Sequence, residues 1–181
     1  MLKEITQNIP VRYTVLGTID GVIACLAIVI GVFSANVESN VIVAAGLSGG
    51  IGLGISNGIG GLMAEYTVEH RRMRTIEEAM MVKSGSMKGT LVHKGIQKKL
   101  IYDTITHGGC SLLGAMLPIL PFVFLDIQTA IVVSIVLSFM TLFLLGVYMG
   151  AMTKEMLVIA GMKMLLVGIL AAVVVRLLGL H

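Results

Sequence analysis

Charged residues are scarce in this sequence. Asp, Glu, Lys and Arg make up only 13% of the 181 residues, while hydrophobic residues make up 56%. An ordinary soluble domain has about 25% charged residues, so this composition excludes one and indicates a membrane protein. Five apolar spans of about 20 residues each, with one loop of moderate size, account for nearly the whole chain. No room remains for a separate soluble domain.

Cysteine and catalytic patterns are also nearly missing. Cys25 and Cys110 lie in apolar segments and form no CxxC motif, so we interpret both as small packing residues rather than disulfide or metal-binding thiols. The sequence contains no recognisable triad of nucleophile, base and orienting residue and no cofactor-binding loop, which argues against an enzyme. Basic residues cluster in one loop rather than along a nucleic-acid-reading face, so we expect no nucleic acid partner. Because no cofactor-binding loop is present, we also expect no cofactor.

Five apolar stretches predict an all-α membrane protein with a single transmembrane domain over residues 1–181. Helices close their backbone hydrogen bonds internally, as hydrocarbon demands, and no alternating polar pattern suggests a barrel. The first stretch contains Asp20 and lacks a convincing small-residue cleavage site, so we interpret it as a mature helix rather than a signal peptide. The predicted spans are residues 13–34, 41–66, 108–125, 129–152 and 156–180.

Lys and Arg residues lie almost entirely on one side of these spans. If the N-terminus is cytoplasmic, only Arg176 falls on the opposite side. Positive residues are retained in the cytoplasm, so we infer a cytoplasmic N-terminus and an external C-terminus. The tyrosines then mark the cytoplasmic interface; they are Tyr13, Tyr66, Tyr102 and Tyr148.

The predicted cytoplasmic segment, residues 69–107, is basic, with eight Lys and Arg against four Asp and Glu. Its two halves have helical patterns, and Ser84, Gly85 and Ser86 between them predict a turn. Anionic lipid headgroups attract such residues at about 1 kcal/mol each, so we expect this segment to contact the bilayer surface.

Two packing motifs stand out within the apolar spans. Glycines recur every four residues in the second span and form a smooth ridge, for which Gly17, Gly21 and Gly31 of the first span offer a suitable facing surface. Pro118 and Pro121 remove backbone donors and predict a break near the end of the third span, either at a transport site or as a plain packing feature. The glycine ridge of the second span consists of Gly46, Gly50, Gly54 and Gly58.

Asp20 is an isolated carboxylate in the first span, seven residues after Tyr13 and therefore about 10 Å along the helix. A charge at that depth costs at least ~2.5 kcal/mol, so Asp20 is expected to face protein, water or a cation. A transport site is one interpretation, and a protonated or amide-paired structural aspartate is the other. Asn57 lies nine residues before Tyr66 on an antiparallel span, which places it near the level of Asp20.

Glu65 and Glu69 lie on the same helical stripe as Asn57, because positions four residues apart share a face. This stripe is a candidate polar wall for a transport path. Met63 lies about 160° away at ~100° per residue, so its thioether would join the path only if the helix were distorted.

Further ligand types lie in and near the basic segment. Carboxylates suit Fe²⁺ or Mn²⁺, and soft thioethers help to reject Mg²⁺ and Ca²⁺, although methionines also simply cover apolar seams. His107 is a candidate ligand or titrating group, or else a wetted cap at the interface. The other candidates of this second rank are Glu77, Glu78, Met80 and Met81.

Segments in every span resemble the vacuolar iron transporter family. LGTIDGV at residues 16–22 resembles its first-helix Asp-Gly motif, and MAEY at 63–66 resembles the end of its second helix. The double-proline segment GAMLPILPF at 114–122 is similar to that of its third helix. LFLLG at 142–146 and MLLVGILAA at 164–172 resemble its fourth and fifth helices.

The resemblance implies a five-helix protomer that forms a homodimer, with the ion path between subunits, proton exchange driving transport, and Asp20 and Glu65 on the path. The membrane would be the cell membrane in a prokaryote or the vacuolar membrane in a eukaryote. Family members usually have Asp where this chain has Asn57 and Met where it has Gly61, and their long acidic hairpin is reduced here to residues 69–107. The basic field of that segment repels divalent cations.

Two functions follow as hypotheses. In the first, a dimer joined through glycine-rich helix faces exports Fe²⁺ or Mn²⁺ from the cytoplasm in exchange for protons. The metal is the substrate and not a cofactor; it meets Glu65 and Glu69, then passes to Asp20. In the second, the chain is a non-transporting membrane module that uses its glycines for assembly and its basic segment for lipid or protein contact.

Overall fold

The computed structural model of the chain describes residues 2–35 and 37–178, with side chains from residue 11 onward. Every regular element within these residues is helical, which confirms the all-α fold class. The helices are α1 (Leu2–Ser34), α2 (Ser39–Ala79), α3 (Leu91–Ile119), α4 (Pro121–Phe124), α5 (Ile127–Thr153) and α6 (Leu157–Leu178).

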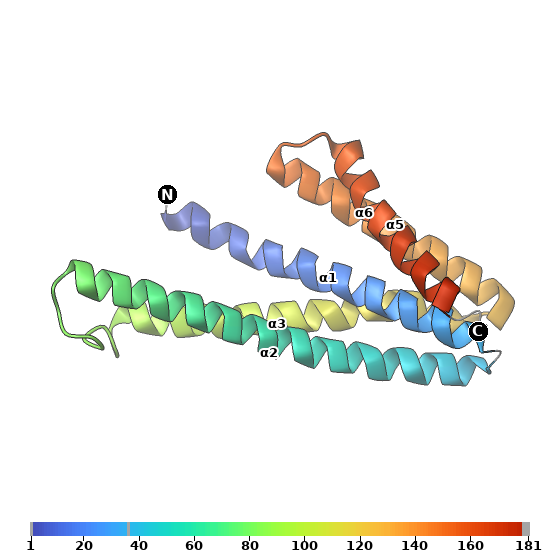
Figure 1. Ribbon diagram of the computed structural model, residues 1–181, viewed down its shortest axis with the longest axis horizontal. Helices are drawn as coiled ribbons and strands as arrows, with labels where there is room; N and C mark the ends of the chain where they lie inside the picture. The colour runs from blue at the N-terminus through green and yellow to red at the C-terminus, as the bar shows by residue number, and fades with distance from the viewer. Residues whose placement is uncertain (1, 36, 179–181) are drawn as a thin grey trace.

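The helices form two groups. α1, α2 and α3 contact one another, with α3 packed most extensively against α1 and α2. α5 and α6 form a hairpin that crosses α1 at an angle (Figure 1). Apolar side chains fill the space where the groups meet, among them Leu26, Val29, Ile42, Ile119 and Ile131.

Four of the described helices are long and apolar enough to cross a membrane: α1 from Val11, α2, α5 and α6. In α3 the first half carries charged residues, so its apolar part begins only after His107. α2 has 41 residues. At 1.5 Å per residue it is about 60 Å long, roughly twice the thickness of the hydrocarbon core. Its charged end beyond residue 66 therefore extends past the membrane. Residues 179–180 of the last predicted span lie outside the described residues.

The break predicted at the prolines is present. α3 ends at Ile119 and α4 begins at Pro121. The Ser134 hydroxyl of α5 donates a hydrogen bond of 2.7 Å to the carbonyl oxygen of Pro118. A neighbouring helix thus satisfies a backbone group at the break, as a membrane environment requires.

The helix–turn–helix predicted in the basic segment is also confirmed, although its turn is longer than the predicted Ser-Gly-Ser tripeptide. α2 continues to Ala79 and α3 begins at Leu91. Within this turn, residues 80–90, Gly85 and Gly89 have φ angles of +90° and +83°, which glycine adopts without strain. Figure 1 shows the turn projecting beyond the rest of the molecule.

The glycine ridge of α2 packs against α3, so the predicted pairing with the glycines of α1 is wrong. A Cβ at Gly54 would lie 3.0 Å from the carbonyl oxygen of Gly108, and one at Gly50 would lie 2.8 Å from the Ala115 side chain. A stripe of small residues permits close approach but does not select the partner, and α3 offers small residues of its own.

The glycines of α1 also face α3. A Cβ at Gly21 would lie 2.0 Å from the carbonyl oxygen of Ser111, and one at Gly114 would lie 2.5 Å from that of Thr18. The two backbones are therefore in direct contact, which supplies van der Waals packing between helices in lipid.

We predict that Gly21→Ala destabilises the protein by about 1–3 kcal/mol or more, because the added methyl group must push the α1 and α3 backbones apart. Gly109→Ala, at an exposed glycine of α3, is the matched control: no atom outside its own stretch of helix lies within 4 Å of its added Cβ, and alanine favours a helix. Thermal unfolding in detergent, followed by circular dichroism, measures both variants. Equal unfolding midpoints would contradict the α1–α3 contact.

Candidate functional site

Asp20, Asn57, His107 and Ser111 form a polar group in the apolar part of the bundle, here called the Asp20 group. The Asn57 Nδ2 atom donates hydrogen bonds to Asp20 Oδ2 at 3.2 Å and to Ser111 Oγ at 2.8 Å. The Ser111 hydroxyl in turn donates to the carbonyl oxygen of His107 at 2.9 Å. The predicted meeting of Asp20 and Asn57 is therefore confirmed, and the amide of Asn57 is oriented from both sides.

The Asp20 side chain is 41% exposed at the surface of the protomer, so this chain does not enclose its carboxylate. An amide donor neutralises no charge. Among the described residues, the polar groups beside this carboxylate are the amide of Asn57 and the imidazole of His107, and neither is a lysine or arginine.

His107 is buried next to Asp20, with its Nε2 atom 3.8 Å from Asp20 Oδ2. Its ring centroid lies 5.4 Å from that of Tyr13. Neither ring nitrogen has a hydrogen-bond partner among the described residues. The absence of a side chain at Gly61 makes room for the ring, because a Cβ there would lie 3.0 Å from His107 Nδ1.

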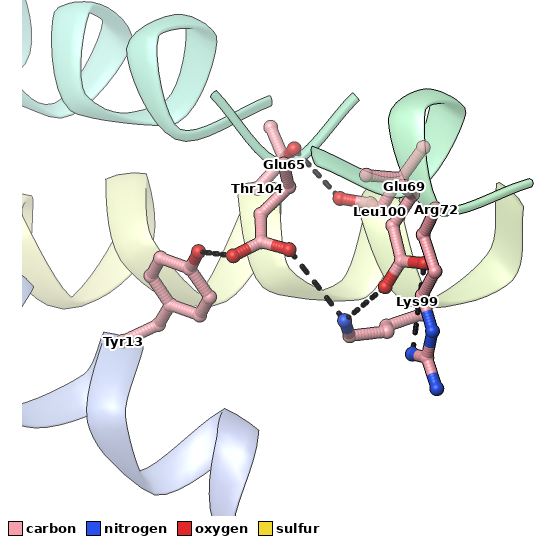
Figure 2. Close-up of polar contacts among 7 residues, drawn as sticks. All are labelled: Tyr13, Glu65, Glu69, Arg72, Lys99, Leu100 and Thr104. Carbon is pink, nitrogen blue, oxygen red and sulfur yellow. Dashed lines mark hydrogen bonds and ion pairs between the residues drawn. The ribbon is translucent and has the colours of Figure 1, made fainter. Parts of the chain in front are cut away.

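A second polar group, here called the Lys99 group, lies nearer the 80–90 turn and is shown in Figure 2. The Lys99 Nζ atom lies 2.8 Å from Glu69 Oε1 and 3.5 Å from Glu65 Oε2. The Tyr13 hydroxyl donates a hydrogen bond to the other oxygen of Glu65. Arg72 Nη1 lies 4.0 Å from the other oxygen of Glu69. Three helices thus contribute to one charged cluster.

Burial makes these ion pairs stronger than surface contacts. The side chain of Glu69 is only 6% exposed, and that of Lys99 is 23% exposed. Burial alone would lower the pKa of Lys99, but the hydrogen bond and charge of Glu69, together with the charge of Glu65, outweigh it and raise the pKa. Lys99 therefore stays protonated between the two carboxylates at neutral pH.

Sequence reasoning missed Lys99 and Asp103. One lysine in a basic segment carries no distinguishing signal, whereas Asp103 could have been noticed because it lies four residues from both Lys99 and His107 on one helix face. Asp103 is buried, and its Oδ2 atom has no hydrogen-bond partner among the described residues.

Met63 does not reach either group. α2 is a continuous helix, so the distortion that Met63 would need is absent, and its side chain is 60% exposed. Met63 and Glu65 point to nearly opposite sides of α2, as expected for residues two positions apart on a regular helix.

The second-rank ligands of α2 and the turn do not converge. Glu77 is buried, and its two oxygens accept hydrogen bonds of 2.8 Å each from the backbone N–H groups of Gly85 and Met87. These bonds, from Met87 and then Gly85, hold the pKa of Glu77 below its ordinary value. By contrast, Glu78, Met80 and Met81 are exposed. Glu77 therefore organises the turn.

No three His, Cys, Asp or Glu side chains in the described part of the chain lie close enough together to hold a metal ion. Within the described residues, Glu65 and Glu69 lie together in the Lys99 group, while Asp20 lies with His107 in the Asp20 group. Carboxylates and imidazole are ligand types that suit divalent transition metals.

We expect Glu77→Ala to loosen the turn and speed tryptic cleavage after Lys83 and Lys88, because two backbone N–H groups lose their acceptor. The exposed Glu78→Ala is the control, and cleavage is followed by mass spectrometry at mildly alkaline pH. Since the native pKa of Glu77 is lowered, its contribution is present at neutral pH and is lost as the pH falls through that lowered value. Equal cleavage of the two variants would refute this role.

Asn57→Ala should destabilise the protein by about 1–3 kcal/mol, because buried Ser111 and the intramembrane Asp20 lose a hydrogen-bond donor. Asn40→Ala, at an exposed position of the same helix, provides a matched control. Thermal unfolding in detergent compares the two, and a lower midpoint for the Asn40 variant would speak against the hydrogen-bonded Asp20 group.

Comparison with known proteins places the chain in a family. It is 37% identical over 164 residues to an uncharacterized protein of Methanocaldococcus jannaschii, an alignment that covers 91% of this chain and 85% of that protein. The sequence pattern of the VIT family matches residues 62–180, a region that contains Glu65, Glu69 and all of α3. The resemblance seen in the sequence motifs is therefore confirmed: this chain is a multi-pass membrane protein that belongs to the VIT family.

Proposed function

We propose that the protein is a transporter that exports a divalent transition metal, Fe²⁺ or Mn²⁺, from the cytoplasm in exchange for protons. Membership of the VIT family supports transport of metal ions across a membrane. The observation that carries the proposal is Asp20, a carboxylate within an apolar span whose side chain is 41% exposed and has no cationic Lys or Arg partner among the described residues.

The topology in this proposal has five spans. α3 beyond His107, together with α4, forms the fifth span in addition to the four apolar helices. The N-terminus is cytoplasmic and the C-terminus external, because this orientation places the 80–90 turn and nearly all Lys and Arg residues on the cytoplasmic side. The basic end of the α2–α3 pair then lies beside anionic lipid headgroups, its proposed partner at the bilayer.

In this scheme the transported ion binds at two sites in turn. Glu65 and Glu69 receive it from the cytoplasm, and Asp20, with His107 beside it, carries it through the apolar region. Carboxylates suit both steps, because they bind metal when ionised and release it on protonation. Protons that return from the other side of the membrane would protonate these carboxylates and so release the metal ion.

A homodimer completes the proposal. The glycine ridge of α2 is occupied by α3 within the protomer, so it is not available to a second protomer. α2 carries a second stripe of small residues, which is exposed and permits another helix to approach. It consists of Ala44, Ser48, Gly52, Ser56, Gly60 and Ala64.

The experiment is uptake of Fe²⁺ and Mn²⁺ into proteoliposomes that hold the purified chain and an imposed pH gradient. We expect Asp20→Ala to abolish uptake, and collapse of the gradient to abolish it in the unchanged protein. Glu38→Ala, which removes an exposed carboxylate in the α1–α2 connection, is the control and should transport normally. Uptake that survives both Asp20→Ala and loss of the gradient would rule out this mechanism.

A further inference from the structure

The carboxylates of Glu65 and Glu69 already hold a cation that belongs to the chain itself. Lys99 reaches them from α3, and its ammonium group lies between two carboxylates that are one helical turn apart on α2 (Figure 2). Two carboxylates at this spacing, with a positive charge between them, have the arrangement expected of an occupied cation site.

Every carboxylate oxygen in this cluster has a partner. Glu65 uses one oxygen for Tyr13 and the other for Lys99. Glu69 uses one for Lys99, while Arg72 lies 4.0 Å from the other. An incoming metal ion therefore finds no unpartnered oxygen on Glu65 or Glu69 and must displace a group of the chain to bind them.

We propose that Lys99 is a tethered cation that occupies the Glu65–Glu69 site when no metal is bound and leaves it when a divalent ion binds. This inference rests on the proposed function: it states that Lys99 must leave the two carboxylates before a metal ion can enter the transport path. A divalent ion carries one more positive charge than the Lys99 ammonium, so it attracts the two carboxylates more strongly than the group that it displaces.

Lys99 is the group able to make this exchange. Its side chain is 23% exposed and ends in a compact ammonium on a flexible stem, so the charge can swing from the site into water. Arg72 is 57% exposed, and its distance to Glu69 is at the outer limit of an ion pair. Lys98, the preceding residue, is exposed and has no ion pair among the described residues.

The test is binding of Mn²⁺ to the purified full-length chain in detergent, measured from the electron paramagnetic resonance signal of free Mn²⁺. Lys99→Gln should tighten binding roughly five- to tenfold, since the competing charged hydrogen bond is lost. Lys98→Gln removes the same charge one residue away and should leave the affinity unchanged. Unchanged or weaker binding by a folded Lys99→Gln protein would overturn the proposal, as would an equal gain in the Lys98 variant.

The site of the gain is checked with the triple variant Glu65→Gln, Glu69→Gln, Lys99→Gln. The tighter binding should disappear, because the oxygens that gain access to metal are gone. Persistence of the gain would place the bound ion elsewhere and refute the inference.

Amine labelling of the unchanged protein tests the movement of Lys99 without any substitution, so it remains decisive if a variant fails to fold. Added Mn²⁺ should increase acylation of Lys99 and leave that of Lys98 constant, as measured by mass spectrometry. Constant labelling of Lys99 at saturating Mn²⁺ would overturn the proposal. Binding and labelling require no transport. A negative result in the liposome experiment can therefore be told apart from a negative result for Lys99.

Discussion

The contact between the backbones of α1 and α3 is the constraint on which the rest of the structure depends. Gly21 lies directly against the Ser111 carbonyl, and Gly114 against that of Thr18. Because these glycines place no side chain at the contact, Asp20, which precedes Gly21, comes within reach of His107. Asn57 of α2 donates hydrogen bonds to Asp20 of α1 and to Ser111 of α3. The packing that holds the bundle together in lipid therefore also builds its intramembrane polar group.

The two polar groups differ in how their carboxylates are compensated. In the Lys99 group, cations of the chain balance Glu65 and Glu69. In the Asp20 group, the nearest partners are an amide and an imidazole, and the carboxylate remains partly exposed. A compensated pair needs no bound ion to be stable in the folded state, whereas an uncompensated carboxylate in lipid gains most from one. Under the proposed function, these groups would control access and passage respectively.

Much of the fold could be predicted because it depends on local properties. Constant helical rise, with tyrosines as depth markers, correctly placed Asn57 at the level of Asp20. The missing backbone donors of Pro118 and Pro121 correctly indicated a break. The α2 glycines were wrongly predicted to face α1 and instead face α3. A row of glycines indicates that a helix packs closely there, but it does not indicate which helix. Lys99 went unnoticed, since in sequence it is one of several equivalent positive charges.

The sequence by itself determined the membrane class, the helical fold and the common level of Asp20 and Asn57, because hydropathy and helical rise depend only on neighbours along the chain. Only the tertiary structure decided which faces meet: that α3 packs against both glycine surfaces, that Lys99 lies between Glu65 and Glu69, and that Met63 points away. The physical reason is that helices in lipid associate through shape and polar contacts rather than through burial of apolar surface. The apolar pattern therefore does not specify their rotation, and close packing sets it.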